Sequence, residues 1–246
     1  MLNSMNMTTF SAVSAPAGFC QRCPTRNHCV AAELEPAELN QLSRIMNLGR
    51  TLPKGAHAFV TGEPVQNEYH VRSGVLKTYF TNSEGVECIT GFYLPGEVVP
   101  SFNRNGYHTH SALALTDATV CIEHTQAGHP ITPELERLRF LIGNRGQQTT
   151  SRVLHQQINL HATSAQARFA GFCTDMMDRL QSLKRTPSYI PTPMSRTDIA
   201  SFLGITLESL SRVISTLKRS GVITADRQGI DILQPEAVRS MAAHLC

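Results

Sequence analysis

Residues 194–223, MSRTDIASFLGITLESLSRVISTLKRSGVI, contain two short amphipathic segments on either side of Gly204. Ser195 is suited to cap the first segment, and Asp198, three residues later, completes a pattern typical of a capping box. Gly204 interrupts the first helix, and Thr206 is suited to cap the second. Two short helices joined by a glycine-containing turn predict a helix-turn-helix over this stretch.

Apolar residues give each of these helices an inner face, and the residues that follow predict a wing. The sequence SGVITADRQGIDIL, residues 220–233, alternates about a turn that contains Gly229, as a small β-hairpin does. The expected inner-face residues are Ile199, Phe202 and Leu203 in the first helix and Leu210, Val213, Ile214 and Leu217 in the second.

The outward face of the second helix is polar and carries the candidate DNA contacts. In a helix-turn-helix this helix enters the major groove. Arg212 can donate a bidentate pair to guanine and Glu208 can accept from a cytosine amine, whereas Lys218 and Arg219 are placed for phosphates. An ordinary solvated helical hairpin is the alternative, but small serines beside a Glu/Arg pair and a basic end favour DNA. The predicted DNA-binding residues are Thr206, Glu208, Ser209, Ser211, Arg212, Ser215, Lys218 and Arg219.

The charge of the chain is divided unevenly between its halves. The 246 residues carry a net charge of +3, but residues 1–123 hold 8 Lys and Arg against 10 Asp and Glu, and the rest hold 14 against 9. An anionic partner is therefore expected at the C-terminal half. The chain lacks the apolar run of about 18–20 residues that a membrane span needs, and FSAVSAPAG near its start lacks the features of a signal peptide. A cytoplasmic protein without a membrane partner is expected.

Residues 50–124 consist of short apolar segments separated by glycines, which predicts an all-β sandwich or jelly roll. A short helix is expected before it, from Glu33 to a stop at Gly49, and two longer helices after it, over 133–160 and 164–183. The predicted class is α+β, with an N-terminal β-roll, a long dimerisation helix and a C-terminal winged helix-turn-helix. The expected divisions are 1–32 (tail with cysteines), 33–132 (roll), 133–162 (dimerisation helix) and 163–246 (DNA-binding domain).

The long helix carries an imperfect apolar seam that starts at Leu138. Such a seam either packs on the β domain or pairs with a second copy of the helix, and spacing alone favours neither. Gly143 and Gly146 interrupt the helix and either loosen a dimer or allow close approach, because glycine costs about 1 kcal/mol in a helix interior. The predicted dimer-interface residues are Ile142, Thr149, Val153 and Leu160.

Three of the seven cysteines lie within ten residues, in GFCQRCPTRNHCVAAEL. In a reducing compartment such clusters bind metal or carry out redox chemistry more often than they form disulfides. An iron–sulfur cluster usually needs four thiolates, so a fourth must come from the folded body. Cys121 and Cys88 are both candidates by spacing, whereas Cys173 and Cys246 are expected to be structural or incidental.

Two other uses of these thiols remain open. Zinc could be held by the three cysteines together with His28 or Cys121, although structural zinc sites favour paired knuckles. A metal-free thiol sensor would use cysteines whose pKa is lowered near Arg22 and Arg26.

The glycine-rich roll, the long helix and the winged helix-turn-helix resemble the cyclic-AMP-receptor/Fnr superfamily of bacterial transcription regulators over residues 20–235. The spacing Cys20-x2-Cys23-x5-Cys29 with a distant Cys121, and the pattern Glu208-x2-Ser211-Arg212, are similar to the Fnr branch. The resemblance implies an oxygen-labile [4Fe–4S] cluster on Cys20, Cys23, Cys29 and Cys121. It also implies a homodimer on a palindromic site of the type TTGAT-N4-ATCAA, contact with RNA polymerase, and a response to oxygen or nitric oxide that controls anaerobic gene expression.

One departure from the wider superfamily concerns the cyclic-nucleotide site. Gly96 and Glu97 are kept, but Thr109, His110 and Ser111 stand where an arginine pair would hold the cyclic phosphate, so no cyclic nucleotide is expected. His108 and His110 are expected to be surface or roll residues. A cysteine or Fe–S enzyme on a cupin-like roll is the alternative from another class. It lacks the expected His/Glu metal set inside the roll, and it leaves the DNA-reading helices unexplained.

Overall fold

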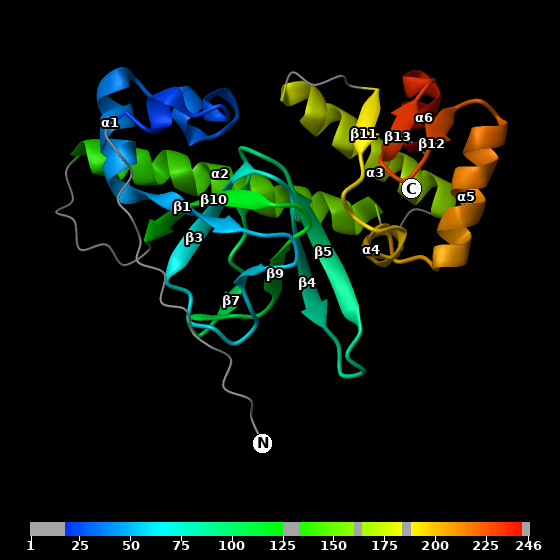
Figure 1. The fold of residues 1–246 in the computed structure, drawn as a ribbon, viewed down its shortest axis with the longest axis horizontal. Coiled ribbons are helices and arrows are strands. Elements are labelled where there is room, and N and C mark those ends of the chain that lie inside the picture. The colour runs from blue at the N-terminus through cyan, green and yellow to red at the C-terminus, as the bar shows by residue number, and fades with distance from the viewer. Residues whose placement is uncertain (1–17, 125–132, 160–163, 184–187, 243–246) are drawn as a thin grey trace.

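The computed structural model describes residues 18–124, 133–159, 164–183 and 188–242. Figure 1 shows the N-terminal turns and α1 at one end, the β-roll in the middle and the C-terminal domain at the other end, with α2 behind all three. The N-terminal elements are η1 (Cys20–Arg22), η2 (Arg26–His28), η3 (Val30–Glu33) and α1 (Pro36–Ile45).

The helix expected from Glu33 to Gly49 is shorter than predicted. It begins at Pro36 behind a capping box formed by Glu35 and Glu38, and it ends at Ile45, where strand β1 follows directly. Gly49 therefore lies within β1 and does not stop the helix. A Cβ at this position would overlap the carbonyl oxygen of Val120 on the neighbouring strand, so glycine permits the close approach of the two strands.

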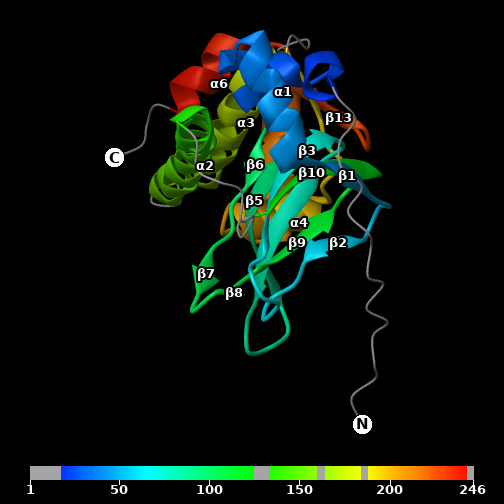
Figure 2. The same cartoon turned by 90° about the vertical axis from the view of Figure 1, so that its left-hand side faces the viewer.

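The β-roll consists of two four-stranded antiparallel sheets that face each other (Figure 2). One has the order β1-β10-β3-β6 and the other β2-β9-β4-β5, with β7 and β8 as a separate hairpin. Side chains such as Leu52, Phe59, Leu76, Tyr93 and Val120 fill the space between the sheets. The strands are β1 (Met46–Leu52), β2 (His57–Phe59), β3 (Asn67–Ser73), β4 (Leu76–Thr81), β5 (Glu87–Tyr93), β6 (Val98–Val99), β7 (Asn103–Arg104), β8 (Tyr107–His108), β9 (Ser111–Ala114) and β10 (Ala118–His124).

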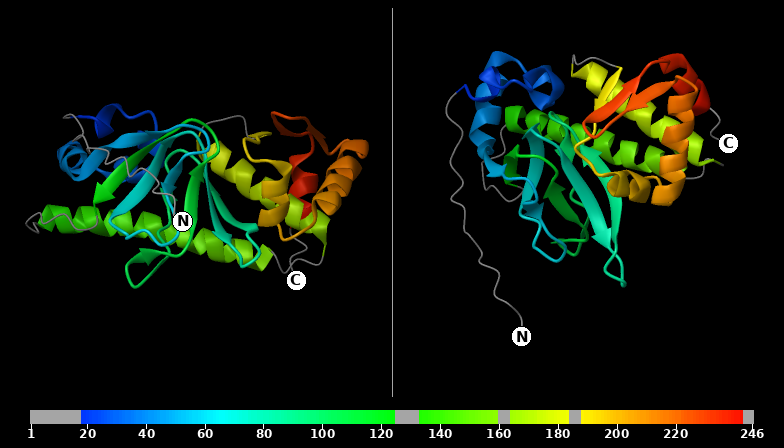
Figure 3. Two further views of the ribbon diagram at one scale, coloured as in Figure 1. Left: turned by 60° about the horizontal axis from the view of Figure 1, so that its bottom comes forward. Right: turned by 45° about the vertical axis from the view of Figure 1, so that its right-hand side comes forward.

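The two long helices appear close to where the sequence predicts them, as α2 (Pro133–Asn159) and α3 (Ala165–Ser182). Helix α2 continues through Gly143 and Gly146 without a break. It runs along one side of the molecule, against the N-terminal turns, α1 and strand β6 (Figure 3, left). One face of α2 is therefore committed to contacts within the chain.

The C-terminal domain is a winged helix-turn-helix (Figure 3, right). Its hairpin β12–β13 is the wing that the sequence predicts, and β11 adds a third strand in the order β11-β13-β12. Its elements are β11 (Tyr189–Pro191), α4 (Arg196–Phe202), α5 (Leu207–Arg219), β12 (Ile223–Ala225), β13 (Gly229–Ile232) and α6 (Pro235–Ala242).

A continuous apolar core joins the roll to this domain. Phe92 on β5 lies with its ring centroid 5.1 Å from that of Phe202 on α4 and 6.3 Å from that of Phe172 on α3. Tyr79, Ile89 and the inner faces of α3–α5 belong to the same cluster. The predicted fold class is confirmed. Within the part of the chain that the structure describes, no helix has both the length and the apolar composition needed to cross a bilayer.

Candidate functional site

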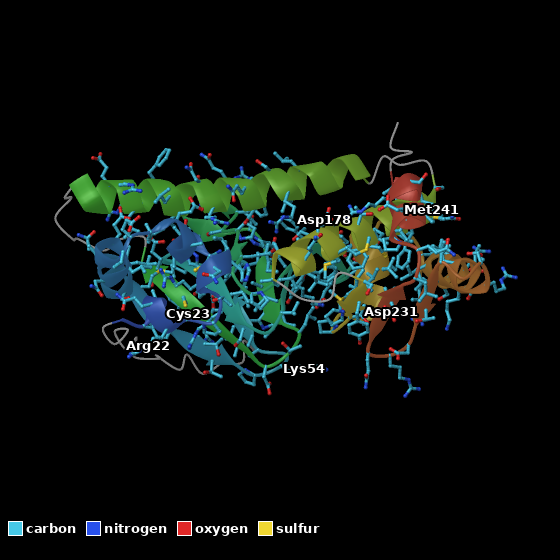
Figure 4. The ribbon with its side chains drawn as sticks, turned by 90° about the horizontal axis from the view of Figure 1, so that it is seen from above. Arg22, Cys23, Lys54, Asp178, Asp231 and Met241 are labelled. Carbon is cyan, nitrogen blue, oxygen red and sulfur yellow. The ribbon has the colours of Figure 1, made fainter. Side chains whose placement is uncertain are left out.

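The N-terminal cysteines lie in or directly beside three consecutive 3-10 turns, which α1 holds in place: Cys20 begins η1, Cys23 follows it, and Cys29 lies between η2 and η3. The backbone N–H of Cys20 donates to Ser43 Oγ of α1 at 3.4 Å, and Ser43 in turn donates to the Leu39 carbonyl at 2.8 Å. Cys23 Sγ lies 3.1 Å from Thr25 Oγ1. Figure 4 labels Cys23 on these turns, where they lie against the strand β10.

Cys121 completes a group of four thiols. It lies on β10, and Cys20, Cys23, Cys29 and Cys121 all line one cavity, whose other walls are largely apolar. Tyr69 and Val120 fill the roll, and side chains alternate between the two faces of a strand, so their neighbours His70 and Cys121 line the cavity from the opposite, outer face of this sheet.

The remaining described cysteines are placed elsewhere. Cys88 is exposed on β5, in the sheet that does not contain Cys121, so the structure does not bring this rival ligand to the cavity. Cys173 is buried in the core between the roll and the C-terminal domain, as a small apolar side chain would be. Cys246 lies outside the described residues.

The electrostatics of the cavity differ from those of a reactive-thiol site. Burial, together with the smaller effect of neighbouring thiols, raises the pKa of Cys20 and brings the pKa of Cys29 to about 11 and that of Cys121 to about 12. Arg72 and Arg145 oppose the shift but do not overcome it. Without a metal, the thiols of Cys20, Cys29 and Cys121 stay protonated near neutral pH, so these three do not support the low-pKa sensor. A bound metal ion would be needed to make them thiolates.

His28 is turned away from the thiols. It lines a different cavity, together with Gly96, Glu97 and Arg145. The structure therefore does not assemble the zinc set of three cysteines and His28. Zinc on four cysteines would use the same four thiols as an iron–sulfur cluster.

The cysteine-bearing turns are attached to α2. Cys20 and Val30 belong to an apolar cluster that includes Leu138 and Ile142 of α2. Two ion pairs border this contact, Glu33–Arg145 at 2.6 Å and Glu38–Arg137 at 2.5 Å. Because of these contacts, a change in the position of the turns would directly change the packing against α2.

The inward position of this seam corrects the predicted dimer interface. Ile142 is 3% exposed and Thr149 4%, so both are already buried within one chain, and Val153 is only half-exposed. Leu160 lies outside the described residues. The seam is the face that packs on the chain's own body, which was the other option that its spacing left open.

A different face of α2 is open to a partner. Phe140 is 66% exposed and Leu154 62% exposed. Together with exposed Gln147 between them they repeat every seven residues, as the contact positions of paired helices do. Gly143 is exposed on the same face and has open space around its Cβ position. Figure 4 shows this outer side of α2 at the edge of the molecule.

The recognition helix α5 is built as the sequence predicts. Thr206 Oγ1 accepts the backbone N–H of Ser209 at 3.1 Å and caps the helix, while Leu210, Ile214 and Leu217 pack inward. Before it, Ser195 and Asp198 form the capping box of α4. The predicted DNA-binding residues Glu208, Arg212, Ser215, Lys218 and Arg219 are exposed on α5, whereas Ser209 and Ser211 are half-buried.

Several polar contacts orient the exposed side chains of α5. Arg212 Nη1 lies 3.3 Å from Glu208 Oε1, and both side chains remain at least 70% exposed. Ser211 Oγ donates to the Leu207 carbonyl at 2.9 Å, and Lys218 Nζ donates to the Ala225 carbonyl of the wing at 3.0 Å. Lys218 is therefore bound to the wing in this structure.

Sequence reasoning missed three exposed residues beside this helix. Thr216 follows Arg212 by four residues and lies on the same face of α5, a signal that helical spacing already contained. Arg196 begins α4, and Arg227 lies in the wing turn between β12 and β13. The positive charges of Arg196 and Arg227 suit phosphate contacts at the edges of the recognition helix.

The turn between α4 and α5 needs a glycine and is held from α3. Gly204 has a φ of +59°, which a residue with a side chain rarely adopts. Arg168 on α3 donates to the carbonyl of Leu203 at 3.3 Å and to that of Gly204 at 3.2 Å. These bonds fix the angle between the two helices of the motif.

His108 and His110, which the sequence placed either at the surface or in the roll, are both buried in the roll. His108 is 3% exposed and stacks on Phe59 at a centroid distance of 3.9 Å, and His110 is fully buried. Burial lowers the pKa of His110 to about 4. Thr109 Oγ1 donates to the Phe102 carbonyl at 3.0 Å, and Ser111 Oγ accepts the Thr61 N–H at 3.1 Å. Thr109 and Ser111, which stand where the arginine pair would be, thus form hydrogen bonds within their own chain. The lack of cyclic-nucleotide binding stays a prediction.

Comparison with known proteins identifies the family. Residues 49–125 match the cyclic nucleotide-binding domain and residues 167–241 match the Crp-like helix-turn-helix domain. The chain is 33% identical to the nitrogen fixation regulation protein FixK of Bradyrhizobium diazoefficiens, over 92% of this chain and 94% of that protein. The chain belongs to the Crp/Fnr family.

Other Crp/Fnr proteins agree with this assignment. The fumarate and nitrate reduction regulatory protein of Escherichia coli is 28% identical over 92% of this chain and 90% of its own length. Among solved structures, FixK2 from Bradyrhizobium japonicum has the same fold, with a TM-score of 0.65 and 24% identity, over 78% of this chain and 96% of that one. Crp/Fnr regulators bind DNA and act as dimers. The protein is therefore a DNA-binding transcription regulator, and the enzyme alternative is excluded.

Proposed function

We propose that this Crp/Fnr regulator responds to oxygen, or to nitric oxide, through a [4Fe–4S] cluster held by Cys20, Cys23, Cys29 and Cys121. The observation that carries the proposal is the convergence of these four cysteines on one cavity. Its apolar walls belong to the same cluster as the inner face of α2.

The donor set suits such a group. Four cysteines are the usual ligands of a [4Fe–4S] cluster, and a largely apolar wall limits the access of water to it. When bound, the cluster supplies soft metal ions that keep the four thiols deprotonated and that react with dioxygen. Without a metal the raised pKa values leave the thiols of Cys20, Cys29 and Cys121 neutral.

The chain's own contacts then connect the cysteines to DNA binding. Ligation at both Cys20 and Cys121 ties the N-terminal turns to β10. Because the turns also pack on Leu138 and Ile142, their position braces the N-terminal half of α2. With the thiols free, the turns keep only their apolar and ion-pair contacts, and the brace weakens.

The braced form of α2 favours pairing of two chains through Phe140, Gly143, Gln147 and Leu154. A two-fold dimer presents two α5 helices to successive major grooves, about 34–36 Å apart, on a palindromic site. A monomer contacts one half-site, and losing the second set of contacts costs orders of magnitude in affinity. The family resemblance supports half-sites of the type TTGAT and ATCAA, contact with RNA polymerase through surface loops of the roll, and action in the cytoplasm.

The test is made on protein purified without air. We expect visible absorption that bleaches in air, about four irons and four sulfides per chain, and binding to the palindromic duplex that is lost with the colour. Cys121→Ala should abolish iron and sulfide, whereas Cys88→Ala should leave both unchanged. Zinc in place of iron, a colourless protein, or palindrome binding that ignores air would overturn the proposal.

A further inference from the structure

A second group of potential metal ligands lies on the same strands as Cys121. Strands β3 and β10 pair so that Glu68 is opposite Glu123 and His70 is opposite Cys121. Residues two apart on a strand project from the same face, so all four side chains share the outer face of this sheet. One ligand atom from each of Glu68, His70 and Glu123 lies within 4.8 Å of the other two.

Without a bound cation, the two carboxylates of Glu68 and Glu123 make this arrangement unfavourable. Like charges directly opposite each other on neighbouring strands destabilise a sheet. Glu68 is half-buried and the side chain of Glu123 is only 15% exposed, so water screens the repulsion poorly. Glu123 Oε2 is buried and has no hydrogen-bond partner among the described residues.

His70 points into this group with an unpaired nitrogen. The residue is 5% exposed, and its Nε2 atom is buried without a hydrogen-bond partner in the described part of the chain. Nε2 lies 3.7 Å from Glu123 Oε2, which is too long for a hydrogen bond. Leaving such a buried polar atom unpaired costs about 1–3 kcal/mol, so native proteins rarely do so.

We propose that Glu68, His70 and Glu123 bind a divalent metal ion through a ligand set that uses none of the four thiols, at a site that adjoins their cavity, which His70 also lines. Imidazole nitrogen and carboxylate oxygen are ligands for Zn²⁺, Mn²⁺ and Fe²⁺. Two ligand atoms about 2.1 Å from one ion lie about 3.4 Å apart in tetrahedral coordination, close to the 3.7 Å between His70 and Glu123. An ion here neutralises the two carboxylates. It also gives a partner to His70 Nε2 and Glu123 Oε2, the two buried atoms that have no hydrogen bond.

The position of the site gives it a role beside the cysteines. It joins β3 to β10 through Glu68 and Glu123 and through His70, which is paired with Cys121, so its occupation stiffens the strand that carries that thiol. The site does not depend on an iron–sulfur cluster, because its ligands are harder donors that the cysteines do not supply. It would make the regulator sensitive to a divalent cation as well.

The test uses Mn²⁺ alone as the probe, because this hard ion prefers oxygen and nitrogen to thiolate. Bound ion is counted from the loss of the electron paramagnetic resonance signal of free Mn²⁺ in the presence of the full chain. We expect one equivalent per chain, with affinity at least about tenfold weaker in Glu123→Gln and in His70→Gln. Glu84→Gln, which changes an exposed acid in the β4–β5 turn, is the matched control and should bind as the unchanged protein does.

A second measurement covers the folding of the variants. Mn²⁺ should raise the melting temperature of the unchanged protein and of Glu84→Gln but not that of Glu123→Gln, which also loses a like-charge repulsion. Cys23→Ser should keep Mn²⁺ binding, which separates this site from the proposed cluster. The proposal is wrong if no saturable binding occurs below about 1 mM, if Glu123→Gln binds normally, or if Cys23→Ser abolishes binding.

Discussion

Lys77 on β4 and Asp198 on α4 form an ion pair, with 2.9 Å between Nζ and Oδ1, that joins the β-roll to the DNA-reading domain. Lys77 also donates to Glu87 Oε2 at 2.6 Å and is itself 7% exposed. Beside it, Ser201 Oγ donates to the Glu87 carbonyl at 3.0 Å and accepts the Ile89 N–H at 3.1 Å. The helix-turn-helix is thus hydrogen-bonded to the edge of the roll through α4.

Replacing Lys77 with methionine should destabilise this junction. Hydrogen bonds to charged groups contribute about 1.5–3 kcal/mol, and Asp198, whose side chain is 15% exposed, would lose its cationic partner and keep only the capping-box bonds with Ser195. We expect the free energy of unfolding to fall by about 2 kcal/mol in urea titrations followed by circular dichroism. Lys54→Met, at an exposed lysine, should change it by less than about 0.5 kcal/mol. Equal values for the two variants would contradict the role of the pair.

Acid should weaken a second junction, at Glu97. Arg179 of α3 binds both oxygens of Glu97, at 2.9 and 2.7 Å, and Arg152 of α2 binds one at 2.8 Å. Burial raises the pKa of Glu97, but the two arginines outweigh burial and leave the pKa below its ordinary value of 4.5.

The sign of the pH effect follows from this lowered pKa. The stabilisation is complete above pH 4.5 and is lost as the pH falls through the lower pKa of the folded state, because the unfolded chain binds a proton first. The free energy of unfolding should fall by up to about 1.4 kcal/mol per pH unit from this one group as the pH falls below 4.5. Glu97→Gln should show a shallower slope than the unchanged protein in urea titrations across that range, and Glu84→Gln should not. Identical slopes for Glu97→Gln and the unchanged protein would refute the assignment.

Local signals in the sequence predicted much of the fold. Ser195, Asp198 and Thr206 cap their helices through atoms three residues away, so spacing alone identifies them. Gly49 misled the prediction because glycine is common both at helix ends and where strands come close. Only the position of Val120, on a distant strand, decides between the two.

Contacts between distant residues were not predictable in this way. The helical period shows that α2 has an apolar stripe but not which body covers it, so Ile142 was assigned to a dimer and is buried in its own chain. The approach of Glu68 to Glu123 depends on the register of β3 and β10. Spacing alone could not decide whether Cys121 or Cys88 is the fourth ligand. The choice depends on which sheet of the roll each cysteine lies in.

The exposed stripe of α2 should control dimerisation. Leu154→Glu places a charge at the proposed contact between two α2 helices, where a second α2 would have to bury it at a large cost. We expect the air-protected protein to change from dimer to monomer in sedimentation velocity runs and to lose affinity for the palindromic duplex. Leu233→Glu makes the same replacement at a leucine 52% exposed in the C-terminal domain and should remain dimeric. A dimeric Leu154→Glu protein would place the interface elsewhere.

Arg212 should carry sequence discrimination, whereas Arg219 should carry general affinity. A bidentate arginine–guanine contact is worth about 1–3 kcal/mol against the wrong base. Arg212→Ala should therefore narrow the gap in affinity between the palindromic and a scrambled duplex by at least about tenfold. Arg219→Ala should weaken both duplexes alike and reduce the salt dependence by about one ion per half-site. Gel-shift titrations at several salt concentrations measure both quantities. If Arg212→Ala lowers both affinities in parallel and leaves their ratio unchanged, Arg212 is a phosphate contact and the specificity of α5 lies with Glu208 and its neighbours.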